Sequence, residues 1–115
     1  MSVEMLHNPR CSKSRQTLAI LEENGIEPII VDYLSSPPGV EDLREILNLL
    51  DMQPRDLMRK GEAEYKENNL SDATLTTDQL LQAMVDFPKL IERPIVLANG
   101  KARIGRPPES VLEII

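Results

Sequence analysis

The sequence of 115 residues contains one cysteine, no tryptophan and only 3% aromatic residues. A single cysteine cannot form an internal disulfide framework, so a small disulfide-stabilised secreted scaffold is excluded and a reducing cytoplasm is expected. One cysteine and one histidine are also too few ligands for a structural zinc site, so we predict no metal. Because aromatic residues are scarce, leucine, isoleucine, valine, methionine and alanine must build the core.

Long apolar runs and an excess of basic residues are missing as well. No apolar segment approaches membrane-spanning length, and Val3 to Leu6 is too short for the apolar core of a secretory signal. The formal net charge of -6 argues against nucleic acid or an anionic membrane as the main partner, because phosphate binding requires a basic face. We therefore expect a single domain, residues 1–115, that is cytoplasmic and binds any anion in a local pocket.

The one cysteine lies in a polar and cationic segment. Cys11 follows the apolar run Val3 to Leu6 and precedes a run in which Leu18 and Leu21 recur at helical spacing. It is therefore expected at the N-terminal end of a helix, where unpaired N–H groups and the helix dipole favour an anion. Three cationic side chains accompany it, those of Arg10, Lys13 and Arg15. These features favour the thiolate, and we interpret Cys11 as a nucleophile rather than as a small buried apolar residue.

The first half of the chain has the pattern of an α/β protein. Ile29 to Leu34 follows the helix stop at Asn24-Gly25 and predicts a second strand, parallel to the first. Val40 to Leu50 carries apolar residues at helical spacing, which predicts a helix that packs on the sheet rather than one that binds a partner.

The second half predicts helices followed by a hairpin. The pattern from Pro54 to Leu90 is helical and has no strand signal. Two short apolar runs, Pro94 to Leu97 and Ala102 to Ile104, are joined through Asn99-Gly100, which suits a type I′ turn. A last helix is expected from about Pro108 to Ile115.

Four segments resemble one known family. Asn8-Pro9-x-Cys11, followed by Ser14-Arg15, is similar to the active-site loop of the glutaredoxin-coupled arsenate reductases, the ArsC family. The similarity continues through Met58-Arg59-Lys60, Glu92-Arg93-Pro94-Ile95 and Ile104-Gly105-Arg106-Pro107-Pro108-Glu109. Because the chain ends soon after the last motif, it resembles the short members of the family, the YfgD type. The resemblance implies an α/β fold of the thioredoxin-like class, with residues 54–90 as a central helical insertion.

The resemblance also implies roles for individual residues. Cys11 would be the catalytic nucleophile, and Arg59, Arg93 and Arg106 would bind the substrate oxyanion, although by sequence alone each arginine is a surface residue. Planar guanidinium groups grip two oxygens at once and offset the repulsion between a thiolate and an oxyanion. Pro94 would form the cis-proline junction that faces the cysteine.

Three further residues would support the cysteine. His7 either helps to hold the thiolate, as the resemblance implies, or is an ordinary buried histidine. Ser14 donates a hydrogen bond to the thiolate, or its hydroxyl serves the first helical turn, and the two roles are compatible. Arg15 matches the family motif, whereas Arg10 and Lys13 can simply be solvated.

The implied reaction is reduction of arsenate, or a similar oxyanion, to arsenite. Ser14 stands where a Cys-x-x-Cys protein has its second thiol, so an outside thiol must complete the cycle. Glutathione is expected as co-substrate and glutaredoxin as protein partner, with no bound cofactor. Two alternatives stay open: a reductase of glutathionylated proteins or other oxyanions, and a regulator similar to the Spx proteins that bind RNA polymerase. A cysteine phosphatase is disfavoured, because its Cys-x5-Arg loop is replaced by Cys-x3-Arg.

Overall fold

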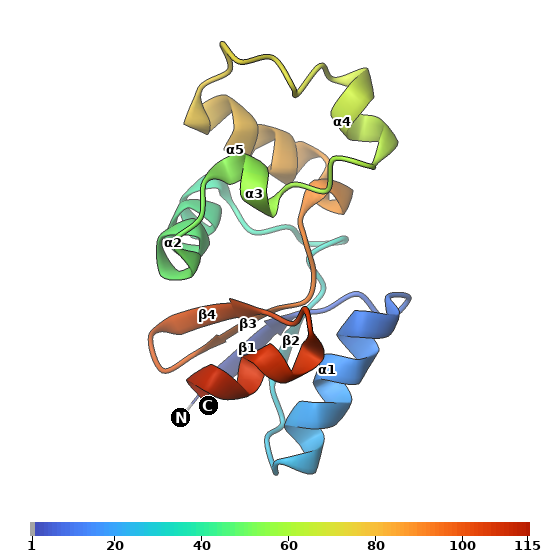
Figure 1. Cartoon of the computed structure of the whole chain (residues 1–115), viewed down its shortest axis with the longest axis vertical. Coiled ribbons are helices and arrows are strands. Elements are labelled where there is room, and N and C mark those ends of the chain that lie inside the picture. The colour runs from blue at the N-terminus through green and yellow to red at the C-terminus, as the bar shows by residue number, and fades with distance from the viewer. Residues whose placement is uncertain (1) are drawn as a thin grey trace. The chain divides into compact units, whose positions relative to one another are not determined.

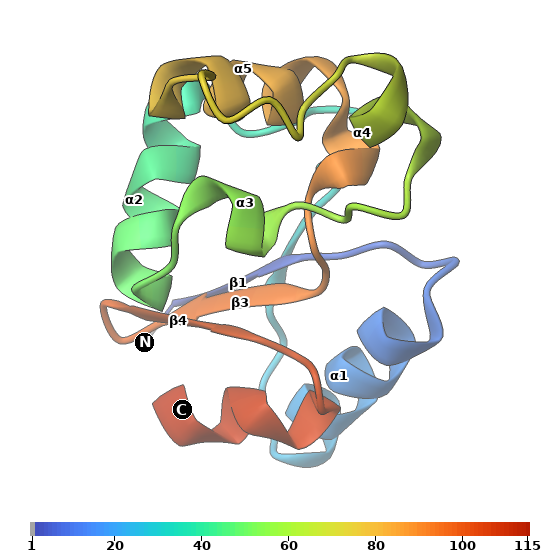
Figure 2. The same cartoon turned by 45° about the horizontal axis from the view of Figure 1, so that its top comes forward.

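A computed structural model describes residues 2–115, so Met1, the first residue of the predicted domain, lies outside the described part. The chain divides into two compact units (Figures 1 and 2). The first consists of the described residues up to Ser36 together with Arg93–Ile115, and the second of Pro37–Glu92. The single domain expected from the sequence stays a prediction. The helical insertion predicted for residues 54–90 falls within the second unit, which begins earlier, at Pro37.

The first unit contains a four-stranded mixed sheet. Its strands are β1 (Val3–Leu6), β2 (Ile29–Val31), β3 (Ile95–Ala98) and β4 (Lys101–Ile104), in the order β2-β1-β3-β4. β1 pairs with β2 in parallel, as the strand-helix-strand pattern predicts, and with β3 antiparallel. The predicted α/β class is thereby confirmed.

The hairpin between β3 and β4 forms at the predicted turn. Asn99 and Gly100 have φ of 55° and 71°, the left-handed values that both central residues of a type I′ turn require. Ile95 pairs with Ile104 and Ala98 with Lys101, so the register follows directly from the two-residue turn. The Asn99 side-chain amide also donates to the Ile114 carbonyl at 2.7 Å, which fastens the turn to the C-terminal segment.

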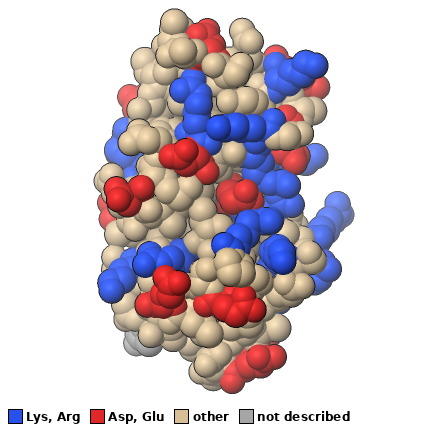
Figure 3. Space-filling view, viewed as in Figure 1, with Lys and Arg blue, Asp and Glu red and all other residues tan. Residues whose placement is uncertain are grey.

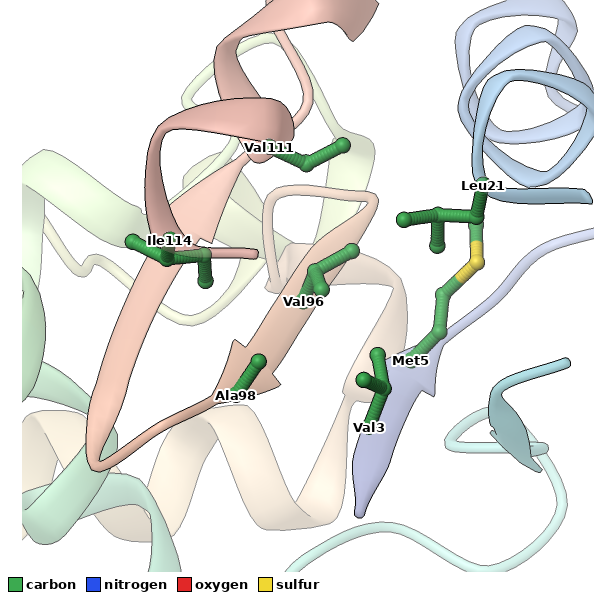
Figure 4. Close-up of a cluster of buried hydrophobic side chains, with 7 residues drawn as sticks. All are labelled: Val3, Met5, Leu21, Val96, Ala98, Val111 and Ile114. Atoms are coloured by element: carbon green, nitrogen blue, oxygen red, sulfur yellow. The ribbon is translucent and has the colours of Figure 1, made fainter. Parts of the chain in front are cut away.

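One face of the sheet is covered by α1 (Ser12–Glu23) and by the 3-10 helix η2 (Pro108–Ile114). Figure 4 shows the apolar cluster that holds these layers together. Val3 and Met5 of β1 and Val96 and Ala98 of β3 meet Leu21 of α1 and Val111 and Ile114 of η2. The alternation of these positions along both strands places every second side chain in this cluster.

The second unit is helical. It contains α2 (Val40–Leu50), α3 (Pro54–Leu57), α4 (Ala63–Glu67), α5 (Thr77–Asp86) and the 3-10 helix η1 (Pro88–Leu90), and α5 packs against α2, α3 and η1. The start of α5 is fixed by a capping box between Thr76 and Gln79. One strand-like contact occurs where the sequence pattern shows none, a bridge between Met58 and Ile91.

Two boundaries differ from the sequence prediction. β2 ends at Val31 rather than continuing to Leu34, because Asp32 starts a turn in which its carbonyl accepts from the Ser36 N–H at 2.9 Å. The last helix has 3-10 rather than α geometry. Within residues 2–115, no helix is long and apolar enough to cross a membrane.

Candidate functional site

Cys11 lies where β1 gives way to α1, at the N-cap position of the helix. Its N–H donates to the Asn8 carbonyl at 3.0 Å, and its own carbonyl accepts from the Arg15 N–H at 3.0 Å. The side chain is 7% exposed. Cys11 thus lies at the helix end where backbone N–H groups without helical partners stabilise negative charge.

The guanidinium of Arg106 contacts the cysteine sulfur. Arg106 Nη2 lies 3.7 Å from Cys11 Sγ, within hydrogen-bond reach of sulfur, and Nε donates to the Arg93 carbonyl at 2.8 Å. The Arg93-Pro94 and Arg106-Pro107 peptide bonds are both cis. The structure therefore brings the residues before β3 and the segment after β4 to the N-terminal end of α1, although 95 residues separate Cys11 from Arg106.

A polar network close to Cys11 in the sequence joins Ser14, His7 and the N–H of Asn8. Ser14 Oγ accepts from the Asn8 N–H at 3.0 Å and lies 2.6 Å from His7 Nδ1, and Ser14 is fully buried. The Ser14 hydroxyl thus ties the end of β1 to the first turn of α1. The pKa of His7 is lowered from 6.5, first by burial and second by the charge of Arg15. The neutral imidazole is the form that the fold favours.

This shift predicts a pH dependence of stability. Because folding lowers the pKa of His7 below its unfolded value, the unfolded chain binds the extra proton more readily. The contribution of His7 to the free energy of unfolding is complete above the pKa that His7 has in the unfolded chain. It is lost as the pH falls toward the lower pKa that His7 has in the folded protein. From about pH 7 to about pH 5, the urea unfolding free energy of the native protein should fall more than that of His7→Gln. Parallel pH profiles of the two proteins would contradict this role of His7.

Gly105, directly before Arg106, packs tightly against Thr17 of α1 and against Pro94. A Cβ on this residue would overlap Thr17 Oγ1 and would lie 2.7 Å from Pro94 Cγ. Gly105 also donates its N–H to the Pro94 carbonyl at 2.9 Å, and Thr17 Oγ1 donates to the Lys13 carbonyl at 2.8 Å. A side chain at position 105 would overlap Thr17 and Pro94 and displace the backbone directly before Arg106.

We expect Gly105→Ala to destabilise the protein by about 1–3 kcal/mol, the usual cost of overpacking, and to lower kcat/KM by displacing Arg106. Thr17→Ala removes both threonine atoms that the new methyl group meets, so Gly105→Ala/Thr17→Ala should recover part of the lost stability and activity. Gly61→Ala is the matched control, because a Cβ there meets open space. Equal melting temperatures of Gly105→Ala and Gly61→Ala would show that the contact is unimportant.

The third arginine predicted for the oxyanion, Arg59, lies in the second unit. Arg59 Nη1 forms an ion pair with Glu62 Oε2 at 2.9 Å, and Nε lies 3.7 Å from Glu92 Oε1. The sequence prediction did not include these two carboxylates. Glu62 had a signal in the sequence, since it follows Arg59 at the i+3 spacing of turn neighbours, whereas Glu92 lies far along the chain.

The remaining cations of the loop are exposed. Arg15 Nη1 donates to the Pro9 carbonyl at 3.0 Å, whereas the side chains of Arg10 and Lys13 project from the surface. On the face shown in Figure 3, Lys and Arg side chains are interspersed with Asp and Glu side chains rather than forming a broad basic surface. Among residues 2–115 there is no group of three His, Cys, Asp or Glu side chains placed to hold a metal ion.

Thr17, Gly105 and the backbone of Asn8 were not predicted to have roles in the site. Gly105 was noted only as part of a motif, and its position directly before Arg106 was the available signal for a close backbone approach. Thr17 carries no such signal, because a threonine within a helical pattern does not indicate which segment it contacts.

A mixed sheet in the order β2-β1-β3-β4, with a cysteine at the start of the helix that follows β1 and a cis-proline before β3, is the arrangement of a thioredoxin-like protein. Comparison with known proteins places the chain more narrowly. The model of the ArsC family matches residues 6–114. This chain belongs to the ArsC family.

Individual relatives agree over nearly the whole length. The chain is 60% identical to the uncharacterized protein YfgD of Escherichia coli (strain K12), over 98% of this chain and 96% of that protein. It is 47% identical to the arsenate reductase of Neisseria meningitidis serogroup A, over 98% and 97%. The solved structure of arsenate reductase from Vibrio cholerae superposes with a TM-score of 0.97 at 54% identity, covering 100% of this chain and 98% of that one. The predicted thioredoxin-like fold and family are thereby confirmed.

Proposed function

We propose that this protein reduces arsenate to arsenite through a covalent intermediate on Cys11, using glutathione as co-substrate and glutaredoxin as partner. The main support for the proposal is the 3.7 Å contact between Arg106 Nη2 and Cys11 Sγ. It places a guanidinium cation beside the one thiol of the chain. The names of relatives at 47% identity support arsenate as the substrate.

The first step is attack by the Cys11 thiolate on arsenic(V). A sulfur–arsenic bond forms, and one arsenate oxygen leaves with a proton as water or hydroxide. The two negative reactants repel each other, and a guanidinium that contacts the sulfur reduces this cost by pairing with the oxygens of the incoming anion. In this proposal the guanidinium groups of Arg106, Arg93 and Arg59 supply that charge.

Two external thiols then complete the reaction. The glutathione thiol displaces a second oxygen and forms a sulfur–arsenic bond of its own. A glutaredoxin thiolate attacks the glutathione sulfur and forms a mixed disulfide, and the electron pair of the broken bond reduces arsenic(V) to arsenic(III). Hydrolysis of the remaining Cys11–arsenic bond releases arsenite. An internal disulfide cannot replace these steps, because the chain has a single cysteine.

Supporting residues hold the loop in this proposal. Ser14 and His7 fix the turn that presents Cys11, and Pro94 carries the carbonyl to which Gly105 binds directly before Arg106. Arg15 holds the Pro9 carbonyl of the same turn. The glutathione-rich cytoplasm is the compartment that suits this chemistry.

One other function uses the same groups. A reductase of glutathionylated proteins also needs a thiolate beside a cation and a glutathione partner. It differs in its substrate, a protein-bound disulfide, for which the oxyanion-binding role proposed for Arg59, Arg93 and Arg106 would have no purpose.

Purified protein should be assayed with arsenate, glutathione, glutaredoxin and glutathione reductase, following NADPH oxidation. We expect oxidation that depends on arsenate and stops when either glutathione or glutaredoxin is omitted. NADPH oxidation with a glutathionylated peptide but not with arsenate would replace the proposal with the second function. Turnover of neither substrate would favour a binding protein of the regulator type.

A further inference from the structure

Asn8 makes three hydrogen bonds to the segment that carries Cys11. Its carbonyl accepts from the Cys11 N–H, its side-chain Oδ1 accepts from the Arg10 N–H, and its N–H donates to Ser14 Oγ, each at 3.0 Å. Two N–H groups of the loop and one fully buried side chain of α1 are thus bound to a single residue. The course of the backbone from the end of β1 to Cys11 is therefore fixed through Asn8.

The side chain of Asn8 closes the turn that leads to the cysteine. The carbonyl bond joins residues 8 and 11, as in a β-turn, and the Oδ1 bond lies inside it. Asparagine commonly makes this second bond to the N–H two residues further on. Without Oδ1 the turn keeps only its main-chain bond, and the Cys11 sulfur is free to move relative to Arg106 Nη2, which lies 3.7 Å away.

Aspartate would form the same turn, so the neutral amide of Asn8 is informative. The chain has 19 acidic residues, yet none of them lies between Glu4 and Glu22. The first turn of α1 also has no acidic residue, although the helix dipole favours one there. A carboxylate in this segment would oppose both a thiolate on Cys11 and an incoming anion. Asn8 supplies the acceptor that the turn needs and adds no negative charge.

We propose that Asn8 is a positioning residue for Cys11, and that its side chain must be neutral because it closes the turn without adding negative charge to the loop of the reacting sulfur. The inference rests on the proposed function only in taking Cys11 as the reacting thiolate. Two substitutions separate the two parts of this role. Alanine removes the acceptor without adding charge, whereas aspartate keeps the acceptor and adds a charge.

The test measures the rate of iodoacetamide labelling of Cys11 against pH, together with arsenate kcat/KM and thermal melting. Asn8→Ala should lower kcat/KM by about tenfold or more, because a small misplacement of a reacting group is costly. Asn8→Asp should melt at or above the native temperature, since aspartate makes the same turn and the dipole of α1 favours its charge. The midpoint of its labelling profile should nevertheless lie about half a pH unit or more above the native one.

Two further variants complete the series. The hydroxyl of Asn8→Ser makes a weaker form of the same bond, so this variant should recover part of the activity lost in Asn8→Ala. Asn24→Asp is the charge-matched control at the C-cap of α1, where the Asn24 side chain donates to the Ile20 carbonyl at 2.8 Å. Because α1 has 12 residues, its ends lie roughly 18 Å apart, beyond the screening length of about 10 Å at 0.1 M salt. Asn24→Asp should therefore lose some stability and leave the labelling profile of Cys11 unchanged.

Native labelling and native kcat/KM in both Asn8→Ala and Asn8→Asp would overturn the inference. A labelling midpoint that moves no further in Asn8→Asp than in Asn24→Asp would do the same, because the added charge would then have no local effect. If Asn8→Ala does not fold, full activity of Asn8→Ser together with a native midpoint of Asn8→Asp would overturn it. Expected shifts in the labelling profiles without arsenate turnover by the native protein would instead overturn the proposed function and leave the role of Asn8 standing.

Discussion

Cys11→Ser should lose all measurable arsenate reduction and melt at the same temperature as the native protein or slightly above it. A serine hydroxyl has no thiolate to attack arsenic, and a serine–arsenic ester cannot be exchanged by glutathione. Stability is retained because residue 11 is the N-cap of α1, with φ of -93° and ψ of 125°, a position at which serine is among the preferred residues. Turnover and thermal melting are to be measured on the same preparation.

The matched control for this variant is Ser12→Ala, which changes the exposed residue next to Cys11 without touching the sulfur. It should keep most of the activity. Residual turnover by Cys11→Ser above the level of a reaction without protein would show that Cys11 is structural. A lower melting temperature together with lost activity would require the serine variant to be refolded and assayed again in the presence of arsenate.

Arg106→Lys should lower kcat/KM by about ten- to a hundredfold, which corresponds to roughly 1.5 to 3 kcal/mol, the range of one hydrogen bond to a charged group. The lysine keeps the charge but cannot donate to the Arg93 carbonyl and contact Cys11 Sγ at the same time, as the two nitrogens of Arg106 do. Corresponding variants of Arg93 and Arg59 are expected to show losses in the same range.

Arg103→Lys is the control for the arginine series. Arg103 lies on β4 close in sequence to Arg106, but its guanidinium pairs with Glu113 at 3.1 Å on the surface. Such an exposed pair contributes at most about 1 kcal/mol to stability and nothing to the reaction. Similar kcat/KM values for the Arg106 and Arg103 variants would remove Arg106 from the oxyanion site.

The strands were predictable because short-range signals fix them. Asn99-Gly100 allows the left-handed backbone of the tight turn, and this turn sets the register of β3 and β4. The end of β2 was predicted too late, because Tyr33 and Leu34 have strand propensity while the turn at Asp32 depends on hydrogen bonds that residue types alone do not determine. The residue types of η2 likewise do not distinguish 3-10 from α geometry.

The candidate site was predictable only in part for a similar reason. Cys11 has its signal in its own neighbours, the helix start and the cations around it. The contact between Arg106 and Cys11 spans most of the chain, and no spacing rule gives it; the family motif was the only guide. Glu92 is brought beside Arg59 by the Met58–Ile91 bridge, which a helical pattern conceals.

The most direct test of the account is the mass of the Cys11 peptide after the protein has been mixed with arsenate and glutathione and acid-quenched before glutaredoxin is added. The account predicts a modification of Cys11 that contains both arsenic and glutathione, requires both reagents and disappears once glutaredoxin is supplied. An unmodified Cys11 in a preparation that nevertheless converts arsenate to arsenite would contradict it.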